Sequence, residues 1–180
     1  MPTLNPYRNY NEKDVINLYA FSGALPVNKG TLVQIQGSGF VPSQDPVELL
    51  GSPGASYSNT VSQRYGVTPK VSICGTGSAT PLGITLLDIK ETDENGEQLK
   101  FNPRKAHELE AVISGQAVPI VRKGVFHYSG ITGTPTAGGK LYVGANGTID
   151  CLQQIASAQV GIALGAKDSA GFTVVLIDIG

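Results

Sequence analysis

The chain is poor in several residue types that carry charge or chemistry. It has no tryptophan, two cysteines, two histidines and 15% charged residues, against a typical charged fraction of ~25%. Its net charge of −1 lacks the basic excess with which proteins neutralise nucleic-acid phosphates. We therefore expect no direct nucleic-acid partner.

Long apolar runs are also missing. No stretch approaches the ~20 consecutive apolar residues that a membrane-spanning helix needs. The first residues, Met1–Asn5, contain no basic segment followed by an apolar core, as a secretory signal would. The sequence therefore predicts no membrane partner and no secretion.

The residue patterns of known catalytic and metal sites are absent from the sequence. G-x-S-x-G, H-E-x-x-H and a Walker loop do not occur. Cys74 and Cys151 are far apart, and His107 and His127 do not fall at metal-ligand spacing. We interpret both cysteines as free, buried thiols, since a disulfide would need an oxidising compartment. Asp88 ends a strand-like segment without an identifiable partner acid or base. The sequence predicts no enzymatic activity, no cofactor and no metal ion.

What the chain does contain is β-forming sequence. It has 41% hydrophobic residues, 23 glycines and 11 prolines, a composition that favours many turns and an all-β fold. In the last third, Lys140–Val143 and Val160–Leu164 alternate as half-buried strands do, and Asn146-Gly147 predicts a turn. Phe172–Ile179 is a nearly unbroken apolar run, which is typical of a strand buried on both faces.

Composition divides the chain into a polar start and a more apolar remainder. Residues 1–21 are predicted to form an extended N-terminal arm, because the polar, Asn-rich start cannot supply a core. This segment is either an arm that lies on a neighbouring subunit or a disordered terminus. Residues 22–180 are predicted to form the core domain, with a long loop at residues 51–66.

The middle of the chain contains the best candidate for a short helix, and we expect at most one. It is Pro103–Glu110, where a proline stands at a favourable first position. The acidic stretch Glu91–Glu97 is predicted to be a hairpin tip that turns at Asn95-Gly96. A calcium site there would bring carboxylates together, but the EF-hand spacing is absent, so we interpret the tip as solvated.

Two short patterns recur in the same order and suggest an internal duplication. Pro26–Gly30 resembles Ile120–Gly124, and Leu82–Leu86 resembles Val160–Leu164. A glycine inside a strand marks a bulge or the close approach of another backbone. A true duplication predicts that the two glycine-containing strands occupy equivalent places in the fold; chance similarity between β segments is the alternative.

The order of several segments resembles the capsid decoration, or cement, proteins of tailed bacteriophages. The resemblance covers most of the chain but neither the stretch 51–66 nor the acidic tip, and it rests on Asn9–Tyr19, Val121–Gly124, Gly139–Val143 with Ala145–Gly147, Val160–Leu164 and Val174–Asp178. It implies a single β-barrel or β-tulip-like domain on the outer surface of the virion capsid, made in the host cytoplasm. Such proteins clamp neighbouring subunits of the major capsid protein.

The resemblance implies two kinds of partner, the major capsid protein and further copies of the same chain, as a homo-dimer or homo-trimer. Tyrosine is favoured at protein interfaces, so we expect the capsid or subunit interface in the N-terminal segment, at Tyr7, Tyr10, Asn11, Val15, Leu18 and Tyr19. The alternative function is a head-surface or tail module that recognises carbohydrate or the host surface. That alternative rests on the stretch Gly51–Gly66 and on Tyr128 and Tyr142.

Overall fold

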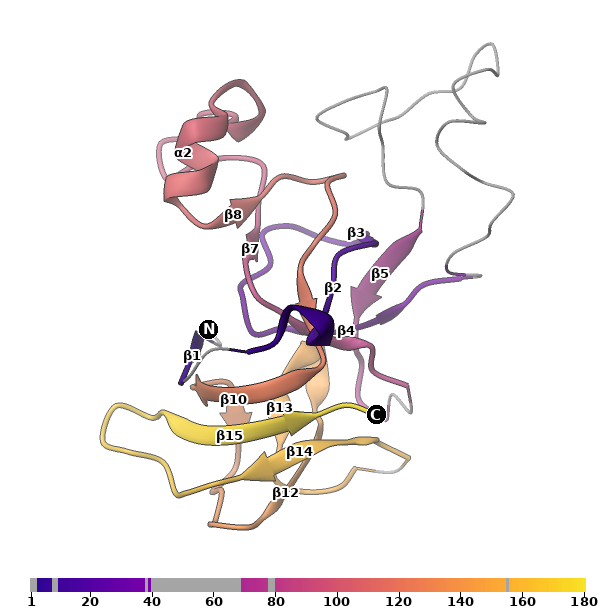
Figure 1. Ribbon diagram of the computed structural model, residues 1–180, viewed down its shortest axis with the longest axis vertical. Coiled ribbons are helices and arrows are strands. Elements are labelled where there is room, and N and C mark those ends of the chain that lie inside the picture. Colours follow the sequence, from indigo (N-terminus) through magenta and orange to yellow (C-terminus); the bar gives the residue numbers. More distant parts are fainter. Residues whose placement is uncertain (1–2, 8–9, 38, 40–68, 78–79, 155) are drawn as a thin grey trace.

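The computed structural model describes residues 3–7, 10–37, 39, 69–77, 80–154 and 156–180. This part of the chain is mainly β, with one short α-helix, so the all-β prediction is confirmed (Figure 1). The predicted loop at residues 51–66 lies outside the described residues.

A seven-stranded sheet forms the lower part of the molecule in Figure 1 and curls as half of a barrel. Its neighbouring strands are antiparallel except for the parallel pair β11 and β13. In spatial order the strands are β1 (Leu4–Pro6), β10 (Lys123–Tyr128), β15 (Thr173–Asp178), β14 (Gln159–Ala163), β12 (Lys140–Val143), β13 (Ile149–Asp150) and β11 (Ile131–Thr132).

A six-stranded sheet lies above it in Figure 1. In spatial order its strands are β2 (Val15–Ile16), β9 (Ile120–Val121), β6 (Gly83–Thr85), β4 (Leu32–Ile35), β5 (Lys70–Ile73) and β3 (Ala20–Phe21). The short strands β7 (Asp88–Ile89) and β8 (Ala111–Val112) form a separate parallel pair. The predicted strand 82–89 is therefore broken: its first part pairs within the six-stranded sheet and its second part with β8.

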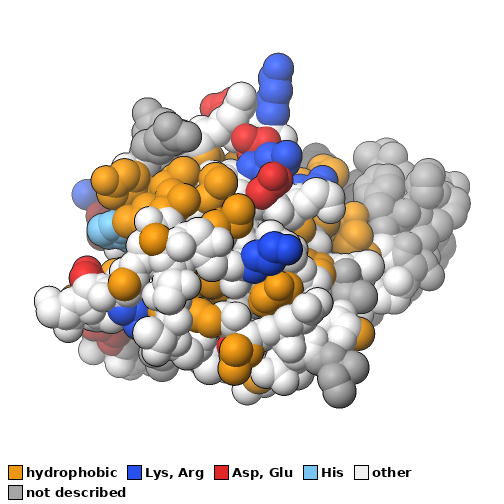
Figure 2. Space-filling model, turned by 90° about the horizontal axis from the view of Figure 1, so that it is seen from below, with side chains coloured by type: hydrophobic (Ala, Val, Ile, Leu, Met, Phe, Trp, Pro, Cys, Tyr) orange, Lys and Arg blue, Asp and Glu red, His pale blue; other side chains and the backbone are white. Residues whose placement is uncertain are grey.

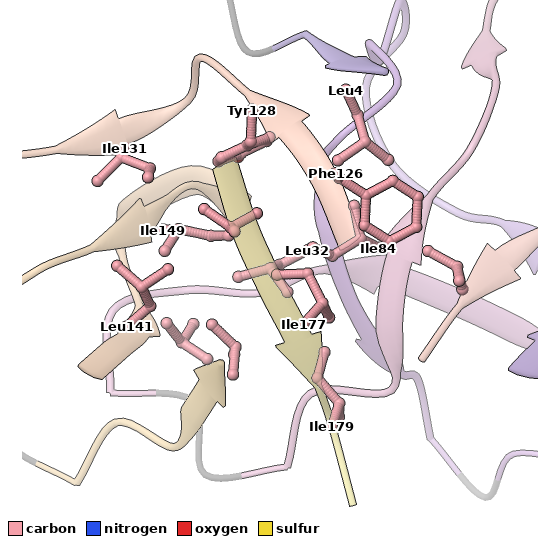
Figure 3. Close-up of a cluster of buried hydrophobic side chains, with 14 of the residues drawn as sticks. Leu4, Leu32, Ile84, Phe126, Tyr128, Ile131, Leu141, Ile149, Ile177 and Ile179 are labelled. Carbon is pink, nitrogen blue, oxygen red and sulfur yellow. The ribbon is translucent and has the colours of Figure 1, made fainter. Parts of the chain in front are cut away.

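The largest hydrophobic cluster joins the two main sheets. Inward side chains of the seven-stranded sheet, such as Phe126, Leu141 and Ile177, meet Leu32 and Ile84 of the six-stranded sheet (Figure 3). A second cluster around Phe21, Val33 and Ile120 joins the six-stranded sheet to Ile89 and Val112 of the β7–β8 pair. Two sheets that share one apolar core form one folding unit.

The residues from Leu87 to Gln116 form what we call the helical lobe. It contains β7, the 3₁₀ turn η3 (Leu99–Phe101), α2 (Pro103–Glu108) and β8 around a small core of Leu99, Ala106 and Ile113. The predicted helix is confirmed, although it ends at Glu108. Its first residue is the proline, and the Asn102 side chain accepts a hydrogen bond from the Lys105 backbone N–H at 3.3 Å.

The N-terminal segment was predicted as an arm apart from the core, and the structure differs. Leu4 is 2% exposed in the main cluster, and β1 pairs with β10. The segment continues through η1 (Glu12–Asp14) to β2, which pairs with β9, and β3, which pairs with β5. Isolated apolar residues at strand spacing therefore hold this polar segment on both sheets of its own chain.

The duplication hypothesis is wrong. Gly83 lies on β6, which pairs directly with β4, the strand after the first Lys-Gly turn. Gly161 lies on β14, which does not pair with β10, the strand that contains the second Lys-Gly pair, because β15 lies between them. The two glycines share only a local role. A Cβ at Gly83 would meet the Val121 carbonyl oxygen, and one at Gly161 the Leu176 carbonyl oxygen. Both therefore allow the close backbone approach that the sequence suggested.

The local turn predictions are confirmed at both Asn-Gly sites. Asn146 and Gly147 have φ of 52° and 72° within the 3₁₀ turn η4 (Ala145–Gly147), and Gly96 has φ of 82°. Asparagine and glycine tolerate this left-handed conformation better than other residues. Cys74 and Cys151 are thiols rather than disulfide partners, but only Cys74 is fully buried.

Candidate binding surface on the seven-stranded sheet

The last strand places apolar side chains on both sides of the seven-stranded sheet, but the described part of the chain covers only one side. Thr173, Val175 and Ile177 point into the molecule and are buried. Val174 and Leu176 point outward and are half-buried. The sequence predicted a strand buried on both faces, and this is wrong for the described chain: the apolar run is buried on one face only.

The neighbouring strands extend this apolar surface. In an antiparallel sheet, residues directly opposite each other lie on the same face. His127 on β10 is opposite Val174, and Ile162 on β14 is opposite Leu176. The register therefore brings outward side chains of three strands together.

Aromatic rings complete the surface at one margin. The Tyr7 ring, in a side chain that is 62% exposed, lies 5.3 Å from the His127 ring, centroid to centroid. The Phe172 ring lies 6.3 Å from the His127 ring. These distances fall in the range of favourable aromatic pairs. We call this surface the outer face and define it by Tyr7, His127, Ile162, Phe172, Val174 and Leu176. Figure 2 looks at the molecule from below and shows hydrophobic side chains gathered there.

A shallow charged cavity of about 250 Å³ adjoins the outer face and shares Leu176 with it. Tyr10, Asn11 and Asp14 line one side of the cavity. On the other side, the Lys123 ammonium contacts the Asp178 carboxylate at 3.0 Å. Both partners of this ion pair are about half exposed, so the pair contributes little to stability. It instead gives the apolar surface a charged margin that could orient a partner.

Three of the six predicted interface residues lie at this site. Tyr7 belongs to the outer face, and Tyr10 and Asn11 line the adjoining cavity, where the Tyr10 ring lies 6.1 Å from the Phe126 ring. The Asn11 side chain also accepts a hydrogen bond from the Lys13 backbone N–H at 3.0 Å, so it begins η1.

The other three predicted residues lie elsewhere. Val15 packs on the main cluster and pairs with Val121 of β9, and Tyr19 packs on the second cluster. Leu18 is 61% exposed and belongs to the short segment of the chain that connects β2 to β3. The structure therefore does not bring these three residues to the outer face.

Phe172, Val174 and Leu176 were missed because the last apolar run was predicted to be buried on both faces, and His127 and Ile162 because nothing in the sequence places their strands beside it. The signal available in the sequence was the alternation of side chains between the two faces of a strand. In an antiparallel sheet, one face of a strand packs on the core and the other often faces solvent. A continuous apolar run in such a strand therefore places apolar side chains on the solvent face as well. Distinguishing the two cases required knowing that no other element of the described chain covers β15.

The acidic tip, residues 91–97, is organised around the buried carboxylate of Asp93, and its other carboxylates do not gather around a common point. Asp93 accepts hydrogen bonds from the backbone N–H groups of Asn95 at 2.9 Å and Glu97 at 2.7 Å, and it forms an ion pair with Lys105. The Lys105 ammonium holds the pKa of the Asp93 carboxyl below its ordinary value, and Asp93 in turn raises the pKa of Lys105. Within the described residues, no group of three or more His, Cys, Asp or Glu side chains is placed to hold a metal ion.

Of the residues named for carbohydrate recognition, Tyr128 is not accessible to a ligand. The Tyr128 side chain is buried, and its hydroxyl donates to the Gly30 carbonyl oxygen at 2.9 Å. The stretch 51–66 lies outside the described residues, and Tyr142 is half-buried. The helices of the described chain include none that is both long and apolar enough to cross a membrane.

No protein-family model matches this chain, and no curated protein matches it. The outer face is therefore interpreted from its own geometry and chemistry.

Proposed function

We propose that this chain is a structural virion protein, a decoration protein that binds the major capsid protein on the outside of a tailed-phage head. The observation that carries the proposal is the apolar outward side of β15 and its neighbours, which no other strand or helix of the described chain covers. Exposed apolar patches on soluble domains mark protein interaction sites. The resemblance of the sequence to cement proteins supplies the identity of the partner.

The composition of the outer face suits protein binding. Aromatic residues are enriched and charged residues depleted at the centre of protein interfaces. Here Tyr7, His127 and Phe172 form an aromatic row beside Val174 and Leu176, and the Lys123–Asp178 ion pair lies at the margin. Removing apolar surface from water contributes about 25 cal/mol per Å². The rigid sheet lowers the entropic cost, because these side chains are already held in place.

The N-terminal segment has a role in this proposal that differs from a free arm. Its pairing with β10 holds Tyr7 on the outer face and Tyr10 at the adjoining cavity before any partner binds. Many copies bound in a symmetric lattice then stabilise the shell through avidity. The proposal involves no catalysis and no cofactor.

Co-sedimentation tests the proposal. Purified heads that lack this protein, from the phage that carries its gene, are incubated with the full chain before and after shell expansion. We expect saturable binding in a fixed ratio to the major capsid protein. Absence of binding to both kinds of shell contradicts the proposal. A glycan array then tests the recognition module that the sequence left as the alternative.

A further inference from the structure

The cavity that adjoins the outer face contains a carboxylate without a partner. Asp14 ends the 3₁₀ turn η1, is half-buried and lines this cavity. Within the part of the chain that the structure describes, its carboxylate takes part in no hydrogen bond or ion pair. Partial removal of a carboxylate from water is unfavourable unless an opposite charge or hydrogen-bond donors replace the water. A cation in the adjoining cavity would therefore stabilise Asp14.

The other two charged residues of the lining neutralise each other. The Lys123 ammonium contacts the Asp178 carboxylate at 3.0 Å, so this pair contributes no net charge to the cavity. The remaining lining residues, such as Tyr10 and Asn11, are uncharged. Asp14 is therefore the charge that an incoming group meets, and it selects a cation.

The sheet side of the cavity is apolar and continues the outer face. Val125 of β10 lies opposite Leu176 of β15, so both side chains are on the outward side of the sheet. Both line the cavity together with Tyr10, which is 38% exposed. At ~30 Å³ per water molecule, the volume of about 250 Å³ corresponds to roughly 8 waters, which is room for one long side chain. Such a side chain, entering from the outer face, would lay its methylene groups on Val125 and Leu176 and bring its end to Asp14.

The backbone around η1 holds Asp14 in place. The Asp14 backbone N–H donates to the Asn11 carbonyl oxygen at 3.0 Å, and the Asp14 carbonyl oxygen accepts from the Arg122 backbone N–H at 2.9 Å. The Asn11 side chain also fixes the start of the turn through its hydrogen bond with the Lys13 backbone N–H. A residue whose backbone is already ordered loses less conformational entropy when a partner binds. The charge is thus presented in a fixed position.

We propose that the adjoining cavity takes one arginine side chain of the protein that docks on the outer face. Its guanidinium pairs with the Asp14 carboxylate and lies against the Tyr10 ring. Arginine suits this site better than lysine, because a planar guanidinium binds a carboxylate through two N–H groups, stacks on aromatic rings and is more weakly hydrated. The inference rests on the proposed function and adds the chemistry of the partner surface, an apolar patch with an arginine at its edge.

An isolated arginine side chain tests the cavity without any capsid. The isotope-labelled full chain is titrated by NMR with N-acetylarginine N-methylamide into the tens of millimolar, because one side chain alone binds weakly. We expect saturable shifts of the backbone amide signals of Asn11, Asp14 and Gly124, which line the cavity. The citrulline analogue has the same shape without the charge and gives no such shifts. The lysine analogue gives smaller ones, and Asp14→Asn abolishes those from arginine.

Shell binding tests the same residue in the presence of a partner. Asp14→Asn keeps the shape of the side chain and removes its charge. We expect at least about tenfold weaker binding to phage heads that lack this protein, and a weaker dependence of binding on salt. Circular dichroism verifies that the variant is folded.

Two variants serve as controls for shell binding. Glu12→Gln is the matched one, because it removes a negative charge from the same turn, whereas Glu12 is exposed and does not line the cavity. Leu152→Ser changes a leucine that is 69% exposed and belongs to neither the outer face nor the adjoining cavity. Both controls should bind shells as the unmodified chain does.

The outcomes separate this inference from the capsid proposal. If the unmodified chain binds shells and Asp14→Asn binds equally well, or Glu12→Gln binds as weakly as Asp14→Asn, the arginine site is overturned while the capsid proposal stands. If the unmodified chain binds no shell, the capsid proposal fails, and the titration still decides the cavity. A titration without shifts at the cavity, or with equal shifts from the citrulline or lysine analogue, overturns the arginine site.

Discussion

Tyr128 links the two main sheets through a single hydroxyl. The residue lies on β10, and its buried O–H donates to the carbonyl oxygen of Gly30, just before β4 of the other sheet. A Cβ at Gly30 would lie 2.9 Å from the Tyr128 ring, so the glycine, with φ of 91°, is also needed for this contact. The sequence suggested Tyr128 as a recognition residue. That suggestion failed because the hydroxyl's partner is 98 residues away and leaves no local signal.

Tyr128→Phe removes the hydroxyl and keeps the ring. It leaves the Gly30 carbonyl oxygen without this buried donor, and we expect the free energy of unfolding to fall by about 1–2 kcal/mol at neutral pH. Urea denaturation of the variant and the unmodified chain measures the difference. An unchanged midpoint would mean that the hydrogen bond does not contribute.

The same residue predicts a dependence on alkaline pH. Burial raises the pKa of Tyr128 above its ordinary value, because the charged phenolate is disfavoured in the core. Below the unfolded-state pKa of about 10, Tyr128 is protonated in both the folded and the unfolded chain, and the free energy of unfolding has its full value. As pH rises above about 10, the unfolded chain releases the proton more readily than the folded chain, so the free energy of unfolding falls. Unfolding curves from pH 9 to pH 11 should show a steeper loss of stability for the unmodified chain than for Tyr128→Phe.

At the scale of elements, the sequence predicted local features better than pairings. The two Asn-Gly turns, α2 and the strands from Lys140 onward follow from residues close in the chain, and the structure contains them. The splitting of residues 82–89 between two sheets and the one-sided burial of β15 depend on which strands lie alongside. Such long-range pairing is set by the whole core, so no short motif encodes it.

Gly161 on β14 tests the packing between β14 and β15, two adjacent central strands of the seven-stranded sheet. Its backbone approaches β15 so closely that a Cβ would overlap the Leu176 carbonyl oxygen and reach 3.1 Å from the Ile177 Cα. Gly161→Ala should lower the free energy of unfolding by roughly 2–3 kcal/mol, because backbone atoms must shift to admit the methyl group. Thermal unfolding is compared with Gly165→Ala, where the added Cβ meets nothing within 4 Å. Equal effects of the two substitutions would contradict this account.

At the scale of the whole molecule, the N-terminal segment connects the fold to the proposed function. Tyr7 and Tyr10 lie on or beside the outer face, and the sequence could single them out because tyrosines stand out in a polar segment. It could not separate them from Val15 and Tyr19, which have the same apolar character but contact the two hydrophobic clusters. Only the pairing of β1 and β2 with different sheets makes that distinction.

The attachment of this segment changes what its removal is expected to do. Deleting residues 1–13 removes Leu4 from the main cluster and β1 from the sheet, so we expect loss of stability rather than a folded chain that merely fails to bind. Leu4→Ala alone should cost about 3 kcal/mol, as other fully buried leucines do. Guanidinium denaturation measures this cost, and an effect below about 1 kcal/mol would indicate that the segment is only loosely attached.

The outer face is the centre of the functional account, and shell binding by a fold-preserving variant tests it most directly. Tyr7→Ser removes an exposed ring, and Val174→Thr keeps the β-branched shape while making the outward side chain polar. Phage shells are titrated with this double variant, with Leu152→Ser as control and with the unmodified chain. We predict at least about tenfold weaker binding for the double variant and unchanged binding for the control. Full binding by the double variant would show that the capsid is held by another surface.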